Sequence, residues 1–185
     1  SESDSEVILK LLALELDGHE PSALHMFKAI EASMHRLVGS YAVVGIDGTG
    51  GLFGFRDPDG IRPLVFGSRV NSEGLPVYAL ASESIALTYL GYTIENEIAP
   101  GEAIYIGADR QVSRKVLFQR SISPCMFESV YFSRVESELE THSIYETRFQ
   151  LGLVLAERIK ELGIVADVVV PVPETSRSAA IAIAE

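Results

Sequence analysis

The chain has 185 residues, and its 15 Lys and Arg against 26 Asp and Glu give a formal net charge of −11. This acidic balance, without a basic block, argues against a nucleic-acid partner, which needs a phosphate-neutralising surface. Apolar residues make up 47% of the chain, enough for a sizeable core, but no apolar run reaches the roughly 18 residues that cross a membrane.

Two helices are expected in the first forty residues. The chain opens on the acidic, polar stretch SESDSEVILK, which does not resemble a secretory signal peptide. In SDSEVILKLLALEL the apolar residues recur at helical spacing, and Ser3 with Glu6 forms a capping-box start. A second helix is predicted to begin near Pro21 and to run through Leu37, with Gly39 ending it.

Residues 40 to about 118 form a predicted β-rich region. Runs of β-branched and aromatic residues alternate there with turn-forming stretches such as DPDG and NSEG. The runs are SYAVVGI, GLFGFR, RPLVFGS, PVYALAS and EAIYIG. One short helix is expected over 84–90. This texture is typical of a meander or of layered sheets.

Two turns in this region carry residues that invite a functional interpretation. The glycine-rich DGTGG turn lacks the GKS or GKT of a phosphate loop, so a simple hairpin is favoured. The stretch RDPDGIRPL contributes Arg56, Asp57, Asp59 and Arg62. A salt-bridged structural turn is the favoured interpretation, and arginines that reach an anionic ligand are the alternative.

The pattern changes near residue 120, where we place a boundary between domains 1–120 and 121–185. FESVYFSR predicts a further strand, and residues 143–162 predict a long helix whose apolar face has Arg148 as its one polar interruption. VADVVVPV predicts a parallel strand buried on both faces, and a helix start, RSAAIAIAE, follows PETS. Helix, buried strand, turn and helix indicate an α/β unit after an α+β portion.

The strongest local signal for chemistry lies between that strand and the last helix, at Glu174, Thr175 and Ser176. Ligands of open α/β sheets bind at the carboxyl ends of strands, and the free N–H groups of a helix start attract phosphate. One interpretation is therefore a site for a phosphorylated or metal-bridged ligand. The other, which spacing alone favours, is ordinary helix capping by Thr175 or Ser176.

Other reactive groups give weaker signals. Cys125 is the only cysteine, so it excludes an internal disulfide and fits a reducing compartment. It is a catalytic thiol, a cluster ligand or, most commonly for such a residue, a buried small side chain. Ser1 has the chemistry of an N-terminal nucleophile, but its place in an acidic stretch before a helix disfavours that role. The four histidines show no metal-ligand spacing.

Taken together, several strings resemble one family. SDSE before a helix, LFGFRDPDGIRPL, ASESIAL, APGEAIYI, PCMFESVYFSR, SIYETR and DVVVPVPETS follow one another as in the amidophosphoribosyltransferase family, over essentially the whole chain. The resemblance implies an internal fragment of an enzyme that transfers glutamine-derived ammonia to phosphoribosylpyrophosphate (PRPP), giving 5-phosphoribosylamine in purine biosynthesis.

For the fold, the resemblance implies that 1–120 is the later part of an αββα N-terminal-nucleophile glutaminase domain. Residues 121–185 are then a linker and the first elements of a type I phosphoribosyltransferase domain. A cytoplasmic homo-oligomer is expected.

The resemblance also implies roles for single residues. Asp4 matches the aspartate that holds the α-amino group of glutamine. Glu174, Thr175 and Ser176 match the pyrophosphate loop, where Thr175 lies near Mg²⁺. Cys125 matches a position that is a 4Fe–4S cluster ligand in some members and a plain cysteine in others.

The chain also departs from the family pattern. It lacks the nucleophilic Cys, the arginine that grips the glutamine carboxylate, the Asn-Gly oxyanion donors and the paired acidic residues of the second transferase strand, and SRVESELETHS replaces SRPDS. The 185 residues alone are therefore expected to be inactive. One alternative is a non-catalytic paralogue that acts as a scaffold or nucleotide-sensing module. Another is a sugar-phosphate or asparagine-forming amidotransferase, against which PVPETS argues.

Overall fold

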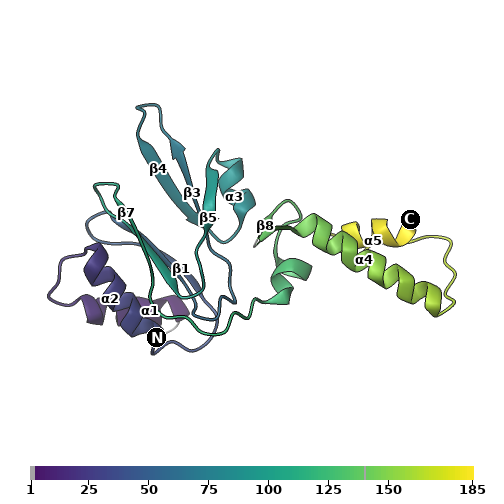
Figure 1. Cartoon of the computed structure of the whole chain (residues 1–185), viewed down its shortest axis with the longest axis horizontal. Coiled ribbons are helices and arrows are strands. Elements are labelled where there is room, and N and C mark those ends of the chain that lie inside the picture. Colours follow the sequence, from purple (N-terminus) through teal and green to yellow (C-terminus); the bar gives the residue numbers. More distant parts are fainter. Residues whose placement is uncertain (1–2, 140) are drawn as a thin grey trace.

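The computed structural model of the chain describes residues 3–139 and 141–185, so the alternative raised for Ser1 lies outside the described residues. Figure 1 shows a body of helices and sheets from which two helices project as an arm. We call residues 3–118 the body, residues 119–139 the junction and residues 142–185 the arm.

The elements follow the chain in this order. The helices are α1 (Asp4–Leu16), α2 (Ala23–Met34), α3 (Ser84–Tyr89), α4 (Ile144–Glu161) and α5 (Arg177–Ala184), with one π-helical turn, η1 (Glu128–Phe132). The strands are β1 (Ala42–Ile46), β2 (Leu52–Arg56), β3 (Val65–Val70), β4 (Pro76–Ala81), β5 (Thr93–Glu97), β6 (Glu102–Ile106), β7 (Val112–Val116), β8 (Glu138–Leu139) and β9 (His142–Ser143).

Hydroxyl caps begin the first two helices. The Ser3 side chain accepts a hydrogen bond from the Glu6 amide at 3.3 Å, which confirms the predicted start of α1. Ser22 caps α2, which begins at Ala23, so Pro21 precedes the helix and does not lie in its first turn. This helix ends at Met34, before the predicted end at Leu37, because the next amides fold back onto the Ser33 carbonyl in a tight final turn.

The body is layered, as the alternation of its strands predicts. One sheet has the order β1-β2-β6-β7 and the other the order β4-β3-β5, with antiparallel pairing throughout. Strand β6 shows why the layers stack, because Ala103 and Tyr105 pack toward the helices while Ile104 and Ile106 pack toward the second sheet. Helices α1 and α2 cover one face of the first sheet, and α3 packs on the second.

Strands β5 and β7 were not among the predicted runs. Their sequences, TIENE and VSRKV, contain too many polar residues to resemble a core strand. Each becomes a strand by pairing at the edge of a sheet, β5 with β3 and β7 with β6.

Two predicted strands of the C-terminal part are wrong. FESVYFSR contains the π-helical turn η1, and the side chain of Arg148 in α4 donates to the backbone of Ser129 and Ser133 there. The VADVVVPV run is not a strand, and Val165 and Val170 are 94% and 79% exposed. A parallel strand needs neighbouring strands on both sides to bury it, and none flanks this run among the described residues.

Candidate functional site

A cavity of about 870 Å³ lies between the start of α1, strand β1 and the junction. Its polar lining includes Asp4, Arg62, Glu83 and Glu128, and Phe132 contributes to its apolar wall. Asp4 lies in the first turn of α1, where the helix dipole favours a carboxylate, and its side chain is exposed. A mostly apolar cavity with a few converging polar groups is the usual form of a small-molecule site.

An ion pair between Arg62 and Glu128 forms part of the cavity wall where the body meets the junction. The Arg62 guanidinium donates to the Glu128 carboxylate, and it lies 5.2 Å above the centre of the Phe132 ring. Glu128 and Phe132 are the first and last residues of η1. The position of η1 therefore decides the shape of this wall.

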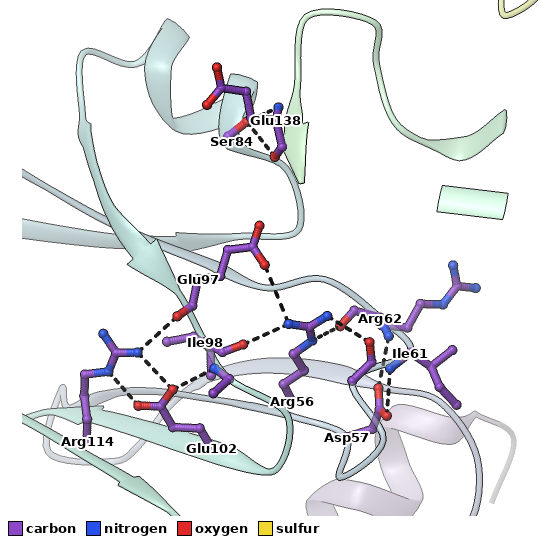
Figure 2. Close-up of polar contacts among 12 residues, drawn as sticks. Arg56, Asp57, Ile61, Arg62, Ser84, Glu97, Ile98, Glu102, Arg114 and Glu138 are labelled. Carbon is purple, nitrogen blue, oxygen red and sulfur yellow. Dashed lines mark hydrogen bonds and ion pairs between the residues drawn. The ribbon is translucent and has the colours of Figure 1, made fainter. Parts of the chain in front are cut away.

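The buried Asp57 fixes the turn that carries Arg62. Its carboxylate, which is 0% exposed, accepts hydrogen bonds from three backbone amides at 3.0–3.1 Å. The donors are Asp59, Ile61 and Arg62. Figure 2 shows two of these contacts beside the Arg56 side chain.

Arg56 complements Asp57 by satisfying backbone carbonyls. Its guanidinium is buried and donates to three carbonyl oxygens at 2.5–3.1 Å. The acceptors are Gly60, Arg62 and Ile98. A carboxylate of Glu97 lies 3.7 Å away (Figure 2). RDPDGIRPL is thus a turn in which the two buried charges bind backbone groups and not each other.

Tyr41 lines the cavity with a phenol that stays protonated. Burial raises the pKa of Tyr41 to about 12, the charge of Asp57 adds to this effect, and Arg120 opposes it. Its hydroxyl is buried without a hydrogen-bond partner among the described residues. At neutral pH this side chain is not a general base.

The predicted pyrophosphate-loop residues lie in the arm. Ser176 occupies the N-cap position of α5, but its hydroxyl donates to the Val172 carbonyl and caps no amide, so side-chain capping by Ser176 is wrong. The Glu174 carboxylate pairs with Arg177 at 2.8 Å, and Thr175 is half-buried. Figure 1 shows α1 and α5 at opposite ends of the molecule, so the structure does not bring these residues near Asp4.

Cys125 is half-buried beside a second cavity of about 320 Å³, which His142 and Thr147 also line. No group of three or more His, Cys, Asp or Glu side chains that could hold a metal ion occurs among the described residues. A 4Fe–4S cluster takes four thiolate ligands, whereas this chain supplies one. Its residues therefore do not fit such a cluster by themselves.

Sequence patterns did not identify Glu83 and Glu128 as residues of this site. They lie 45 positions apart in the chain, and neither belongs to a spacing that indicates chemistry. The only signal was their place in ASESIAL and PCMFESVYFSR, two strings that carry the family resemblance. No described helix is both long and apolar enough to cross a membrane.

Known proteins resemble this chain from end to end, although no protein-family model matches it. Amidophosphoribosyltransferase from Lachancea kluyveri is 42% identical over 190 residues, which cover 98% of this chain and 37% of that protein. The enzyme of that name from Escherichia coli K12 is 43% identical, with the same coverage. The chain is homologous to the amidophosphoribosyltransferases.

The fold leads to the same group. The solved structure of glutamine PRPP amidotransferase from Bacillus subtilis, complexed with ADP and GMP, matches with a TM-score of 0.81 and 33% identity. The match covers 99% of this chain and 37% of that chain. The resemblance to amidophosphoribosyltransferases is confirmed in sequence and in mixed α/β fold, and the chain spans a little over a third of the length of these relatives.

Proposed function

We propose that this chain is part of an amidophosphoribosyltransferase, which moves ammonia from glutamine to PRPP and releases diphosphate. The observation that carries the proposal is the agreement of sequence and fold with such enzymes over 98–99% of the chain. On this proposal residues 1–120 belong to the glutaminase domain, and residues 121–185 form a linker and the first transferase elements. The whole enzyme acts as a cytoplasmic homo-oligomer.

Asp4 is the proposed glutamine-binding residue. A carboxylate binds an ammonium group through charge-assisted hydrogen bonds, which are stronger than neutral ones. The first turn of α1 directs Asp4 to the cavity, whose volume and mixed lining suit a small polar amino acid. Asp4 therefore serves binding and orientation, and the nucleophile lies outside these 185 residues.

The loop of Glu174, Thr175 and Ser176 is the proposed diphosphate site. Backbone amides at the start of α5 favour an anion, and the Thr175 hydroxyl and the Glu174 carboxylate are oxygen donors of the kind that Mg²⁺ prefers. When bound, Mg²⁺ neutralises the charge of the departing diphosphate. Arg177, which now pairs with Glu174, supplies further positive charge at this loop.

The proposal is tested with the complete gene product, in which phosphoribosylamine formation is measured with glutamine and, separately, with ammonium salt as nitrogen donor. Asp4→Asn should raise the KM for glutamine about tenfold or more, because a charge-assisted contact is lost. The ammonium-driven rate should not change, since free ammonia bypasses the glutamine site. Asp17→Asn, at the other end of α1, is the matched control.

Two outcomes would contradict the proposal. One is a complete gene product without glutamine-dependent or ammonium-dependent phosphoribosylamine synthesis. The other is an equal rise in KM for Asp4→Asn and Asp17→Asn. The isolated 185-residue chain should release no ammonia from glutamine above a buffer blank, because it lacks the nucleophile.

A further inference from the structure

The junction lies between the cavity and the arm, and η1 faces both. On the cavity side, Glu128 and Phe132 form part of the lining. On the arm side, Arg148 of α4 donates to the Ser129 carbonyl at 2.9 Å and to the Ser133 carbonyl at 2.7 Å. The five-residue turn and the residue that follows it thus carry two cavity residues and both acceptors of a side chain from α4.

Arg148 is an unusual residue to find at this place. It is 4% exposed, and removing a guanidinium from water has a large free-energy cost unless its N–H groups are satisfied. Burial lowers the pKa of Arg148, and the charge of Glu83 partly opposes this effect. The side chain remains a cation at neutral pH. Two carbonyl oxygens suit that charge, and that of Ser133 lies at the C-terminal end of the turn, where the dipole is negative.

The body holds the junction from the opposite side. The Glu83 carboxylate, which lines the cavity, accepts from the Arg134 amide and the Ser137 hydroxyl, each at 2.8 Å. The next residue, Ser84, accepts from the Glu138 amide at 2.9 Å (Figure 2). The backbone of the junction is therefore clamped by the body at 134–138 and by α4 at 129 and 133.

A π-helical turn of five residues is held by few backbone hydrogen bonds of its own. The Ser133 amide donates to the Glu128 carbonyl at 2.9 Å, which closes the single wide turn. Single π turns are rare and are frequently found at functional sites. Without the Arg148 contacts, the Ser129 carbonyl of η1 and the Ser133 carbonyl after it would lose their buried donor, and the turn would relax toward a more regular helix.

We propose that Arg148 is a positioning residue for the glutamine cavity: from α4 it holds η1 so that Glu128 and Phe132 form the cavity wall. The inference rests on the proposed function, which supplies the ligand. It adds that glutamine affinity depends on a residue of the arm, which belongs to the proposed transferase part. By linkage, an occupied cavity stabilises the docked position of α4 to the same extent.

The first test uses the complete gene product and separates positioning from simple loss of fold. Arg148→Met keeps the length of the side chain and removes its donors, and it should raise the KM for glutamine about tenfold. The ammonium-driven rate should stay within about twofold, and Arg148→Lys, which keeps one cationic donor, should give an intermediate KM. Arg158→Met is the matched control, because Arg158 lies on the same helix with its side chain 65% exposed.

If Arg148 only stabilised the fold and did not position the cavity wall, the kinetic results would differ. Glutamine-driven and ammonium-driven rates would then fall together with the folded fraction, and the KM for glutamine would not change. That result would overturn the inference. If Arg148→Met does not fold, Arg148→Lys decides alone: a raised KM for glutamine with an unchanged ammonium-driven rate supports the inference, and an unchanged KM overturns it.

The second test requires no activity and uses Cys125 in the 185-residue chain. The Glu128 amide donates to the Cys125 carbonyl at 3.0 Å, so the thiol reports on the start of η1. Arg148→Met should increase the rate of Cys125 modification by a thiol reagent several-fold, and Arg158→Met should not. Equal rates in Arg148→Met and the unmodified chain would overturn the inference even if the enzyme is active. A higher rate in a complete gene product without activity would contradict the proposed function and leave the η1 contact standing.

Discussion

The body and the arm contain similar apolar sequences but bury them to different extents. In the body, Phe55 and Ile104 are fully buried between paired strands. In the arm, Val165 and Val170 belong to an equally apolar run and face solvent. Antiparallel strands are completed by neighbours that a short turn supplies, whereas a parallel strand needs partners that follow a long crossover. In the body, β2 and β6 each pair with a strand on both sides, whereas the VADVVVPV run of the arm pairs with none among the described residues.

The body and the arm also differ in whether their charged side chains are buried or exposed. The body buries Arg56 and Asp57 by saturating them with backbone hydrogen bonds, and these contacts shape the turn beside the cavity. The arm carries exposed pairs between Arg158 and Glu161 and between Glu174 and Arg177, which contribute little stability. Substitutions that disturb packed or saturated groups should thus have far larger effects than changes on the open surface of the arm.

The largest effect is expected from Asp57→Ala in the body. Three half-buried amides lose their acceptor, so the free energy of unfolding should fall by about 3 kcal/mol. Urea unfolding followed by far-UV circular dichroism measures this change. Asp59→Ala, two residues on, removes only an ion pair to Arg120 at 3.7 Å and should cost less than about 1 kcal/mol. Similar losses for the two variants would show that Asp57 does not organise the turn.

An intermediate effect is expected from Gly152→Ala, where α4 and α5 meet. An added Cβ would lie 2.5 Å from the Ala179 carbonyl oxygen and 2.8 Å from the Ala182 Cβ. The helices must separate, at a cost of about 1–3 kcal/mol that is confined to the arm. Hydrogen exchange should accelerate in α5 and remain unchanged in β2 and β6. Val154→Ala, at an exposed position of the same helix, is the control. If this variant accelerated hydrogen exchange in α5 as much as Gly152→Ala does, the result would contradict close packing of α4 and α5 at Gly152.

The smallest effect is expected from Val170→Ser in the arm. Because this side chain is 79% exposed, the free energy of unfolding should change by less than about 0.5 kcal/mol. Val65→Ser in β3 is the matched change at a 3% exposed position, and it should cost about 2 kcal/mol or more. Comparable costs at the two valines would break the contrast between body and arm, because they would mean that the valine run is covered in solution.

Most elements with a local signature could be predicted from the sequence. Ser3 caps α1 as the SDSE pattern indicates, and the DGTGG turn joins β1 to β2 with the Asp47 carboxylate accepting from Thr49 and Gly51. The long helix over 143–162 is confirmed as α4. The failures lie where the outcome depends on distant groups. η1 has the composition of a strand and is held in another shape by Arg148.

The residues of the candidate site also differ in whether the sequence could indicate them. The family resemblance singled out Asp4, and the structure places this residue on the lining of the cavity. No sequence pattern singled out Glu83 and Glu128, since only the fold brings them to the cavity. Their wall depends on Asp57 and Arg148, which act through backbone groups that no sequence pattern records.

By itself, the sequence determined where the main helices lie, the Ser3 cap of α1, the hairpin of β1 and β2 and the family to which the chain is related, because each depends on residues close together in the chain or on their order. The tertiary structure alone decided the second core between the sheets, the cavity beside α1 and the exposure of the valine run. These depend on which distant surfaces meet, and hydrophobic burial and backbone hydrogen bonding settle that choice for the whole fold at once.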